Sequence, residues 1–427
     1  MAIAIGIAVV AVLAAAGAIN AWLGAKKKLA EETARFERET AAFREGMNTM
    51  SAEKAEQTAK IEALEAKTAE LEGKLAELSS AADKSKREQT SQRQFFARKA
   101  RDTFELLKQR LAADGLSDKI EAFTSGGPAK SLSEEAKRLV KETESWMEQA
   151  GSEDPNILHT LGVVDFATGD VKKAELRLRA ATRTSSDVLL QENLGDLMRA
   201  TGRSRRAIES YKNAAKNAKD DATVHRKLGL ALFSTGDYAA AVKPLTLAIH
   251  ADPKNLDLHL KTARALIESG DFQRAVDLTQ STAKRFPKSP ELPACAVIAF
   301  ARMKRFRDAQ GQFEKAIEID PKNPEAHIAR GFAFLDEGKP ADAVASFEKA
   351  LATDPRRAEA HYGIGLVANR SQKFEDALKS LKKAVEIKPD YAEAWYAMKA
   401  TYEGLKKFES ALEALNKAVS LNPHLTS

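Results

Sequence analysis

The sequence predicts an all-α protein: a right-handed α-solenoid of eight helix pairs, preceded by a transmembrane helix and a coiled coil. Three observations predict it. Residues 155–425 repeat every 34 positions, residues 2–25 carry no charge, and residues 29–82 follow a heptad pattern. Short repeats bury their apolar faces only against their neighbours, so the 427-residue chain needs no large globular core.

The repeat is visible as columns of prolines and small residues. Six prolines are each 34 residues apart, namely Pro253, Pro287, Pro321, Pro355, Pro389 and Pro423. Eight alanines form a longer column, namely Ala174, Ala207, Ala241, Ala275, Ala309, Ala343, Ala377 and Ala411. Within a unit, apolar residues recur at spacings of three and four, which predicts two short amphipathic helices. Glycines at 169, 202, 236, 270 and 338 are expected to end the first helix of their units.

These columns resemble the tetratricopeptide repeat (TPR) family over about two-thirds of the chain. The matching features are the alanine column, the terminal proline, a glycine in the first helix (Gly162, Gly195, Gly229, Gly331, Gly365) and a large residue in the second (Tyr211, Leu245, Phe313, Phe347, Leu381, Leu415). The fifth unit departs, with Val297 in place of glycine and an additional Pro293, and the eighth has Lys399 at that place. We therefore expect the fifth unit to pack differently.

The resemblance implies that the first helices line a concave face that binds protein or peptide partners. Carried over position by position, it places these residues in the groove: Arg226, Phe233, Ile328, Phe332, Leu335, Tyr362, Leu366, Asn369, Arg370 and Tyr396. Earlier units would present a more polar surface, including His159, Glu192 and Asp196. The alternative is that the groove residues pack the first helices against one another. The family's Lys and Asn pair for gripping a terminal carboxylate is missing, because His159 and Val163 occupy those places.

Residues 1–25 are expected to form a transmembrane anchor. The uncharged run is long enough to cross a bilayer, and Trp22, Lys26, Lys27 and Lys28 would lie at the membrane interface. A cleaved signal peptide is the alternative, but no basic residue precedes the apolar run. The lysines predict a single-pass protein with its body in the cytoplasm, in a bacterial inner membrane, with a periplasmic body as the alternative.

Residues 26–111 are expected to form a coiled-coil stalk followed by a basic helix. The seam runs through Leu29, Phe36, Phe43, Met50, Gln57, Leu64, Leu71 and Leu78, with a second series that includes Thr33, Thr40, Ile61, Thr68 and Leu75. It predicts a parallel homodimer through residues 29–82, while a single solvated helix is the alternative. Residues 112–132, with Ser125-Gly126-Gly127-Pro128, would be a flexible linker, 133–154 a helix that caps the first repeat, and 155–425 the eight repeats.

No catalytic, metal or cofactor motif is present in the sequence. The lone Cys295 excludes a disulfide within the chain, and we expect it to be a small buried apolar residue. The net charge of +6 is spread thinly, so nucleic acid is not an expected partner. We expect a membrane-anchored scaffold rather than an enzyme. The alternatives are a periplasmic factor for cell-envelope assembly and a regulatory subunit of an enzyme complex.

Overall fold

The computed structural model describes residues 2–46, 54–116, 118–120 and 131–426, with side chains except at 2–18, 42–59 and 426. All regular elements in these ranges are helices, which confirms the all-α prediction. They divide into two compact units, residues 1–117 with 131–157, and residues 118–130 with 158–427. The predicted Ser125–Pro128 joint lies outside the described residues.

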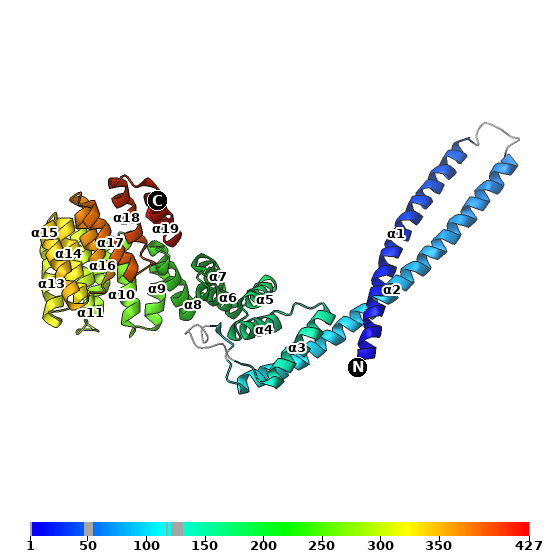
Figure 1. Ribbon diagram of the computed structural model, residues 1–427. Coiled ribbons are helices and arrows are strands. Elements are labelled where there is room, and N and C mark those ends of the chain that lie inside the picture. Colours follow the sequence, from blue (N-terminus) through cyan, green and yellow to red (C-terminus); the bar gives the residue numbers. More distant parts are fainter. Residues whose placement is uncertain (1, 47–53, 117, 121–130, 427) are drawn as a thin grey trace. The chain divides into compact units, whose positions relative to one another are not determined.

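Two long helices of the first unit, α1 (Ala2–Gly46) and α2 (Lys54–Ala113), run antiparallel beside each other (Figure 1). The heptad positions with described side chains are half-buried on both helices, except Leu78, which is 42% exposed. Seam threonines satisfy their hydroxyls within their own helix, as Thr33 does by donating to the Leu29 carbonyl at 2.7 Å. The Lys67 ammonium lies 5.5 Å from the centre of the Phe36 ring, so the two helices touch along this seam.

This arrangement differs from the predicted parallel homodimer through residues 29–82. The seam of α1 faces the seam of α2 in the same chain, so the pairing described is an intramolecular hairpin. A heptad pattern specifies which face of a helix is buried but leaves open which helix buries it, and that is why the sequence identified the stripe and not the partner. Phe43, Met50 and Gln57 lie outside the described side chains.

The predicted anchor belongs to α1, which continues without a break from the apolar run into the charged segment. Trp22 is half-buried, and the Lys26 ammonium lies 4.8 Å from its ring centre, while Lys27 and Lys28 are exposed. In the described part of the chain, no helix combines the length and the apolar character needed to span a bilayer. The side chains of residues 1–18, on which most of the prediction rests, lie outside that part.

The third helix of this unit, α3 (Glu134–Ala150), packs against the end of α2. Ser133 caps its N-terminus, since its hydroxyl accepts the Ala136 amide. The Trp146 ring stacks on Phe96 of α2 with the centroids 5.9 Å apart. The apolar face of α3, predicted to cover the first repeat, thus meets α2, and its role as a repeat cap stays a prediction.

The second unit contains the repeats, which form eight antiparallel helix pairs as predicted (Figure 1). The pairs are α4 (Pro155–Ala167) with α5 (Val171–Thr184), α6 (Val188–Ala200) with α7 (Ser204–Asn217), α8 (Ala222–Ser234) with α9 (Tyr238–Ala251), α10 (Leu256–Glu268) with α11 (Phe272–Ala283), α12 (Glu291–Arg302) with α13 (Phe306–Ile319), α14 (Pro324–Glu337) with α15 (Pro340–Thr353), α16 (Ala358–Arg370) with α17 (Phe374–Ile387), and α18 (Ala392–Gly404) with α19 (Phe408–Leu421). A short 3₁₀ turn, η2 (Pro423–Thr426), follows.

Each pair is held by a close contact between one position of the first helix and one of the second. A Cβ added to Gly331 would lie 2.5 Å from a ring carbon of Phe347, so this phenylalanine fits only against glycine. In the five units with this glycine, the large partner is fully buried: Leu178, Tyr211, Leu245, Phe347 and Leu381. The fourth unit pairs Ala263 with the smaller Thr279, and both are buried. In these six units, a smaller residue on one helix is matched by a larger residue on the other, so the space between the two helices stays filled.

The units without a small residue at this position pack less tightly. Val297 leaves its partner Phe313 half-buried in the fifth unit, and Lys399 leaves Leu415 half-buried in the eighth. The Phe313 ring instead meets His327 of the sixth unit, with ring centroids 5.7 Å apart. This confirms that the fifth unit departs from the others.

The five turn glycines adopt the left-handed conformation, as predicted, with φ between 73° at Gly202 and 96° at Gly169. In the fifth, seventh and eighth units the same position is held by Lys304, Gln372 and Lys406, with φ of 60°, 58° and 57°. The turn geometry is therefore kept in every unit.

The last unit returns to the second and third units. The Arg205 guanidinium donates to the Val419 carbonyl at 3.3 Å, and the Tyr238 hydroxyl donates to Glu393 at 3.4 Å. The Asn422 side chain lies so close to Gly236 that an added Cβ there would be 2.0 Å away. The array thus makes one closed turn, and the first helices of distant units face a common interior.

We predict that Gly331→Ala destabilises the array by about 1–3 kcal/mol, because the new methyl group would overlap the buried Phe347 ring. Gly311→Ala is the matched control. It lies inside α13 with no atom within 4 Å of the added Cβ, and it should stabilise by about 0.5–1 kcal/mol. Thermal unfolding followed by circular dichroism measures both. Equal effects would show that the close contact is unimportant.

We predict that Gly236→Ala opens the closed turn. Gly270→Ala changes a turn glycine with the same positive φ and no neighbour, so both variants share the backbone cost and only Gly236→Ala displaces Asn422. Spin labels on the second and eighth units should move apart in Gly236→Ala and keep their separation in Gly270→Ala. An unchanged distance in both would contradict the closure.

Candidate functional site

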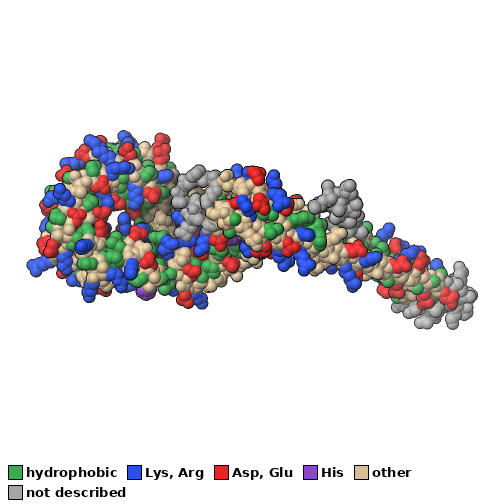
Figure 2. Space-filling view, turned by 90° about the horizontal axis from the view of Figure 1, so that it is seen from below, with side chains coloured by type: hydrophobic (Ala, Val, Ile, Leu, Met, Phe, Trp, Pro, Cys, Tyr) green, Lys and Arg blue, Asp and Glu red, His purple; other side chains and the backbone are tan. Residues whose placement is uncertain are grey.

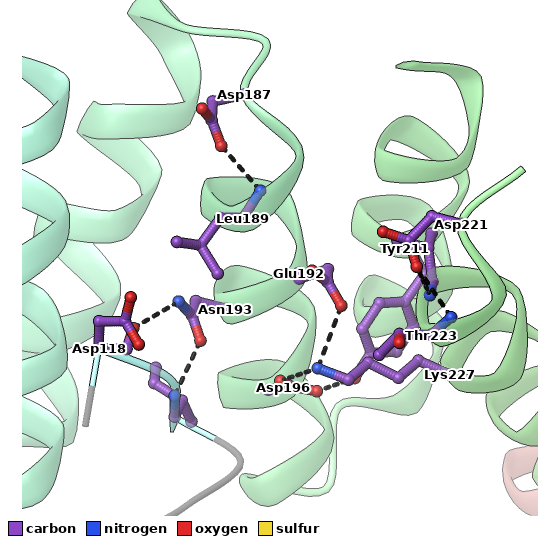
Figure 3. A network of polar contacts seen from close by, with 12 residues as sticks. Asp118, Asp187, Leu189, Glu192, Asn193, Asp196, Tyr211, Asp221, Thr223 and Lys227 are labelled. Atoms are coloured by element: carbon purple, nitrogen blue, oxygen red, sulfur yellow. Dashed lines mark hydrogen bonds and ion pairs between the residues drawn. The ribbon is translucent and has the colours of Figure 1, made fainter. Parts of the chain in front are cut away.

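A buried polar network connects the second and third units (Figure 3). The Lys227 ammonium on α8 lies 2.7 Å from Asp196 and 3.3 Å from Glu192, both on α6. The Tyr211 hydroxyl on α7 donates to the other oxygen of Asp196 at 2.6 Å. Asp196 is fully buried and Lys227 is 8% exposed. The cation is thus held between two carboxylates away from bulk water.

The environment of this network changes its protonation. Burial raises the pKa of Glu192 above its usual range, and Lys227 opposes that change. Burial and the neighbouring Asp196 carboxylate also raise the pKa of Tyr211, which keeps its hydroxyl a donor. Glu192 therefore takes up a proton more readily than an ordinary glutamate.

A second polar site lies beside this network, on the first helices of units one and two. Asn193 of α6 is 1% exposed, and its side-chain oxygen accepts the Ile120 amide at 2.8 Å. Its nitrogen donates to the Asp118 carbonyl at 3.0 Å and lies 2.6 Å from Nε2 of His159 on α4. Figure 3 shows the chain segment at Asp118 running alongside Asn193. The amide therefore binds backbone groups of a segment more than seventy residues away in sequence.

A third polar cluster faces the interior of the closed turn. Arg264 and Glu268 of α10 are 3.9 Å apart, and their side chains are 40% and 41% exposed. Charged and phenolic groups from other units act on Arg264, including Tyr238, Tyr391 and Glu359. Burial raises the pKa of Glu268, against the opposing effect of Arg264. These side chains are surrounded by protein yet open to water, as expected on a concave surface.

The predicted groove residues divide into three groups. Ile328 and Leu335 are each 6% exposed and belong to the hydrophobic core, so the structure places them between helices rather than on the groove surface. Asn369 links helices, donating to the Ala397 carbonyl at 3.3 Å and accepting from Thr401 at 3.0 Å. The others are exposed or half-buried: Arg226, Phe233, Phe332, Tyr362, Leu366, Arg370 and Tyr396.

Three of the four aromatic groove residues make ring contacts. Tyr362 lies 6.2 Å from Phe332 and 5.1 Å from Tyr391, measured between ring centroids. Phe233 meets Tyr238 at 5.3 Å. Tyr396 is 37% exposed and is the most open of the predicted aromatic residues. The packing alternative given by the sequence thus applies to Phe332 and Tyr362, whose rings meet between units, while the binding role of the groove residues stays a prediction.

Sequence reasoning missed Asn193, Lys227 and Arg264. Asn193 and Lys227 each follow directly after a position assigned to the groove, so a strict reading of that pattern passed over them. A signal was present for Lys227, which interrupts an apolar helix 31 residues after Asp196, almost one repeat away. Opposite charges nearly one repeat apart indicate neighbouring first helices.

The surface charge of the array is mixed. On the face shown in Figure 2, Lys and Arg side chains alternate with Asp and Glu side chains. Cys295 on α12 is half-buried rather than fully buried as predicted, and burial raises the pKa of its thiol to about 11. The thiol is therefore protonated at neutral pH, so its reactivity is low.

We predict opposite effects for two changes in the buried network. Lys227→Met leaves two carboxylates buried without a cation and should destabilise by roughly 3 kcal/mol. Glu192→Gln removes one carboxylate and leaves the Lys227 cation paired with the Asp196 carboxylate alone. Because the pKa of Glu192 is raised, the wild type has the full stability contribution of this group at acidic pH and loses it as pH rises through the raised pKa.

Glu192→Gln lacks this titration, so its stability relative to the wild type should increase as pH rises from the ordinary glutamate pKa of about 4.3 through the raised pKa of the folded protein. Hydrogen exchange of α6 to α8 amides measures the local effect of both variants. Equal destabilisation by both at neutral pH would contradict this account of the network.

Comparisons with known proteins agree with the helix pairs. Two family models, both described as tetratricopeptide repeat, match residues 193–255 with 328–392 and residues 232–294 with 368–424. A tetratricopeptide repeat protein from Parabacteroides merdae is 19% identical with a TM-score of 0.47, covering 58% of this chain and 99% of that chain.

Two other solved structures have lower scores. YrrB, described as a TPR protein with an unusual peptide-binding site, is 21% identical with a TM-score of 0.28, covering 43% of this chain and 94% of that one. Human IFIT1 is 16% identical with a TM-score of 0.38, covering 62% and 68%. No curated protein matches the sequence. The matched repeats and the helix pairs together make this chain a tetratricopeptide repeat protein.

Proposed function

We propose that the protein is a membrane-anchored scaffold that binds partner proteins or peptides through the concave face of its repeats. The observation that carries the proposal is the convergence of exposed charged and aromatic side chains from distant units on one interior. Arg264 and Glu268 keep about two-fifths of their side-chain surface in contact with water, and Tyr396 is 37% exposed. Aromatic and arginine side chains on a concave surface are the residues that most often contribute binding energy.

The anchoring part of the proposal rests on the amino-acid sequence. Residues 2–25 carry no charge, and Trp22 with Lys26, Lys27 and Lys28 follows the pattern of a membrane interface. In this proposal the N-terminus lies outside and the body lies in the cytoplasm, at a bacterial inner membrane. A periplasmic body would instead favour a role in cell-envelope assembly, and one stoichiometric catalytic partner would favour a regulatory subunit.

Site-specific photo-crosslinking tests the concave face. A photoreactive residue at Tyr396 should crosslink to a partner in the cells that make the protein, because this ring is the most exposed of the aromatic residues assigned to the groove. The matched control replaces Leu176 of the second helix α5, which is 72% exposed on the other helix layer. We expect a crosslinked product from position 396 and none from position 176. Products from position 176 alone would overturn the proposal.

Protease protection tests the membrane orientation. With protease added outside sealed cells that have lost their outer barrier, the C-terminal Ser427 end should stay intact. Digestion of that end would place the array outside and favour the periplasmic alternative.

A further inference from the structure

The segment Asp118–Ile120 occupies the groove of units one and two in the manner of a bound peptide. Its contacts with Asn193 are made by backbone groups, namely the Asp118 carbonyl and the Ile120 amide. An amide side chain that binds a carbonyl and an amide two residues apart recognises main chain and not a particular side chain. The segment comes from outside the repeats, since it precedes α3 in sequence.

The orientation of the Asn193 amide is set by its neighbour. Burial lowers the pKa of His159, which therefore stays neutral at physiological pH. A neutral Nε2 accepts one hydrogen of the Asn193 nitrogen, at 2.6 Å, while the other hydrogen is donated to Asp118. Both donors are thus used, and the side-chain oxygen is left facing the Ile120 amide.

Side-chain specificity comes from Ile120. It is 0% exposed and belongs to the hydrophobic cluster that includes Val163 of α4 and Leu194 and Leu197 of α6. By contrast, the two residues before it, Asp118 and Lys119, are exposed. The site therefore recognises one aliphatic side chain of a bound segment, together with main-chain groups of that residue and of the residue two positions before it.

We propose that Asn193, held by His159 and next to the Ile120 pocket, is a peptide-binding site that the chain's own Asp118–Ile120 segment occupies. A partner segment with an isoleucine-like residue binds there by displacing the internal segment. This deepens the proposed function and rests on it, because it names one place on the concave face and the chemistry of its ligand. A partner segment must therefore compete with the internal segment for this site, which weakens its apparent affinity.

The factor by which the internal segment weakens the affinity for a free peptide can be estimated from its effective concentration at the site. The segment belongs to the same chain as its site, so it competes with a free peptide at a fixed effective concentration, for which about 1 mM is the value of a short flexible linker and serves as an upper estimate. For an intrinsic dissociation constant of about 0.1 mM, the tethered segment weakens binding of a free peptide about tenfold. Releasing the internal segment should therefore strengthen peptide binding by about this factor.

The test uses the full-length chain and a fluorescent peptide with the sequence of residues 116–123. Ile120→Ala removes most of the buried side chain, so the internal segment should be released and the peptide should bind about tenfold more tightly than to wild type. Lys119→Ala is the matched control, because it makes the same change at the exposed neighbouring residue. Its affinity for the peptide should stay within about twofold of wild type.

Two further measurements identify the site. Asn193→Ala, added to Ile120→Ala, should abolish the gain. Replacement of the buried Asn193 also changes the packing around it, so a second measurement changes only the peptide. The peptide with alanine in place of its isoleucine should lose binding to the Ile120→Ala chain.

The inference is overturned if Ile120→Ala binds the peptide no better than Lys119→Ala, or if the alanine peptide binds equally well. If the crosslink from position 396 still forms in that case, the proposed function stands and only the site at Asn193 is wrong. If Ile120→Ala brings no gain in peptide affinity and no crosslink forms from position 396, the proposed function is contradicted as well.

Discussion

The array depends on one contact that recurs in five of its eight units, between a glycine of the first helix and a large residue of the second. Phe347 shows its reach, because the ring lies against Gly331 of its own unit and Gly363 of the next. One side chain thus fixes both the angle within a pair and the approach of the following pair. Where Val297 replaces glycine, the partner Phe313 is only half-buried, and its ring meets His327 of the sixth unit instead.

Repetition of this contact brings together residues that are far apart in sequence. Small rotations between units add up until α19 and the η2 turn meet the second and third units. Arg264 thereby comes near groups that lie more than ninety residues later, such as Glu359 and Tyr391. The concave surface is a product of the whole array, and no isolated unit would form it.

The sequence predicted most of the fold, because a helix pair leaves a periodic pattern. The eight units, the turn glycines and the irregular fifth unit were all visible as columns. The sequence did not predict what covers a given face. The heptads of residues 29–82 gave the buried stripe, while the hairpin of α1 and α2 depends on where the chain turns back. Ile328 and Leu335 were assigned to the groove by position, but the closeness of neighbouring helices buries them.

Asn193 illustrates the same limit at the candidate site. A single asparagine in a helix has no period, and its role depends on a segment 73 residues earlier. The most direct measurement is hydrogen exchange at the Ile120 amide in the full-length chain, with and without the peptide of residues 116–123. If the segment is a displaceable ligand, the peptide should speed exchange at Ile120 while slowing it in α6. If exchange at Ile120 is unchanged or slower, the segment is a fixed part of the fold, and the account of this groove is contradicted.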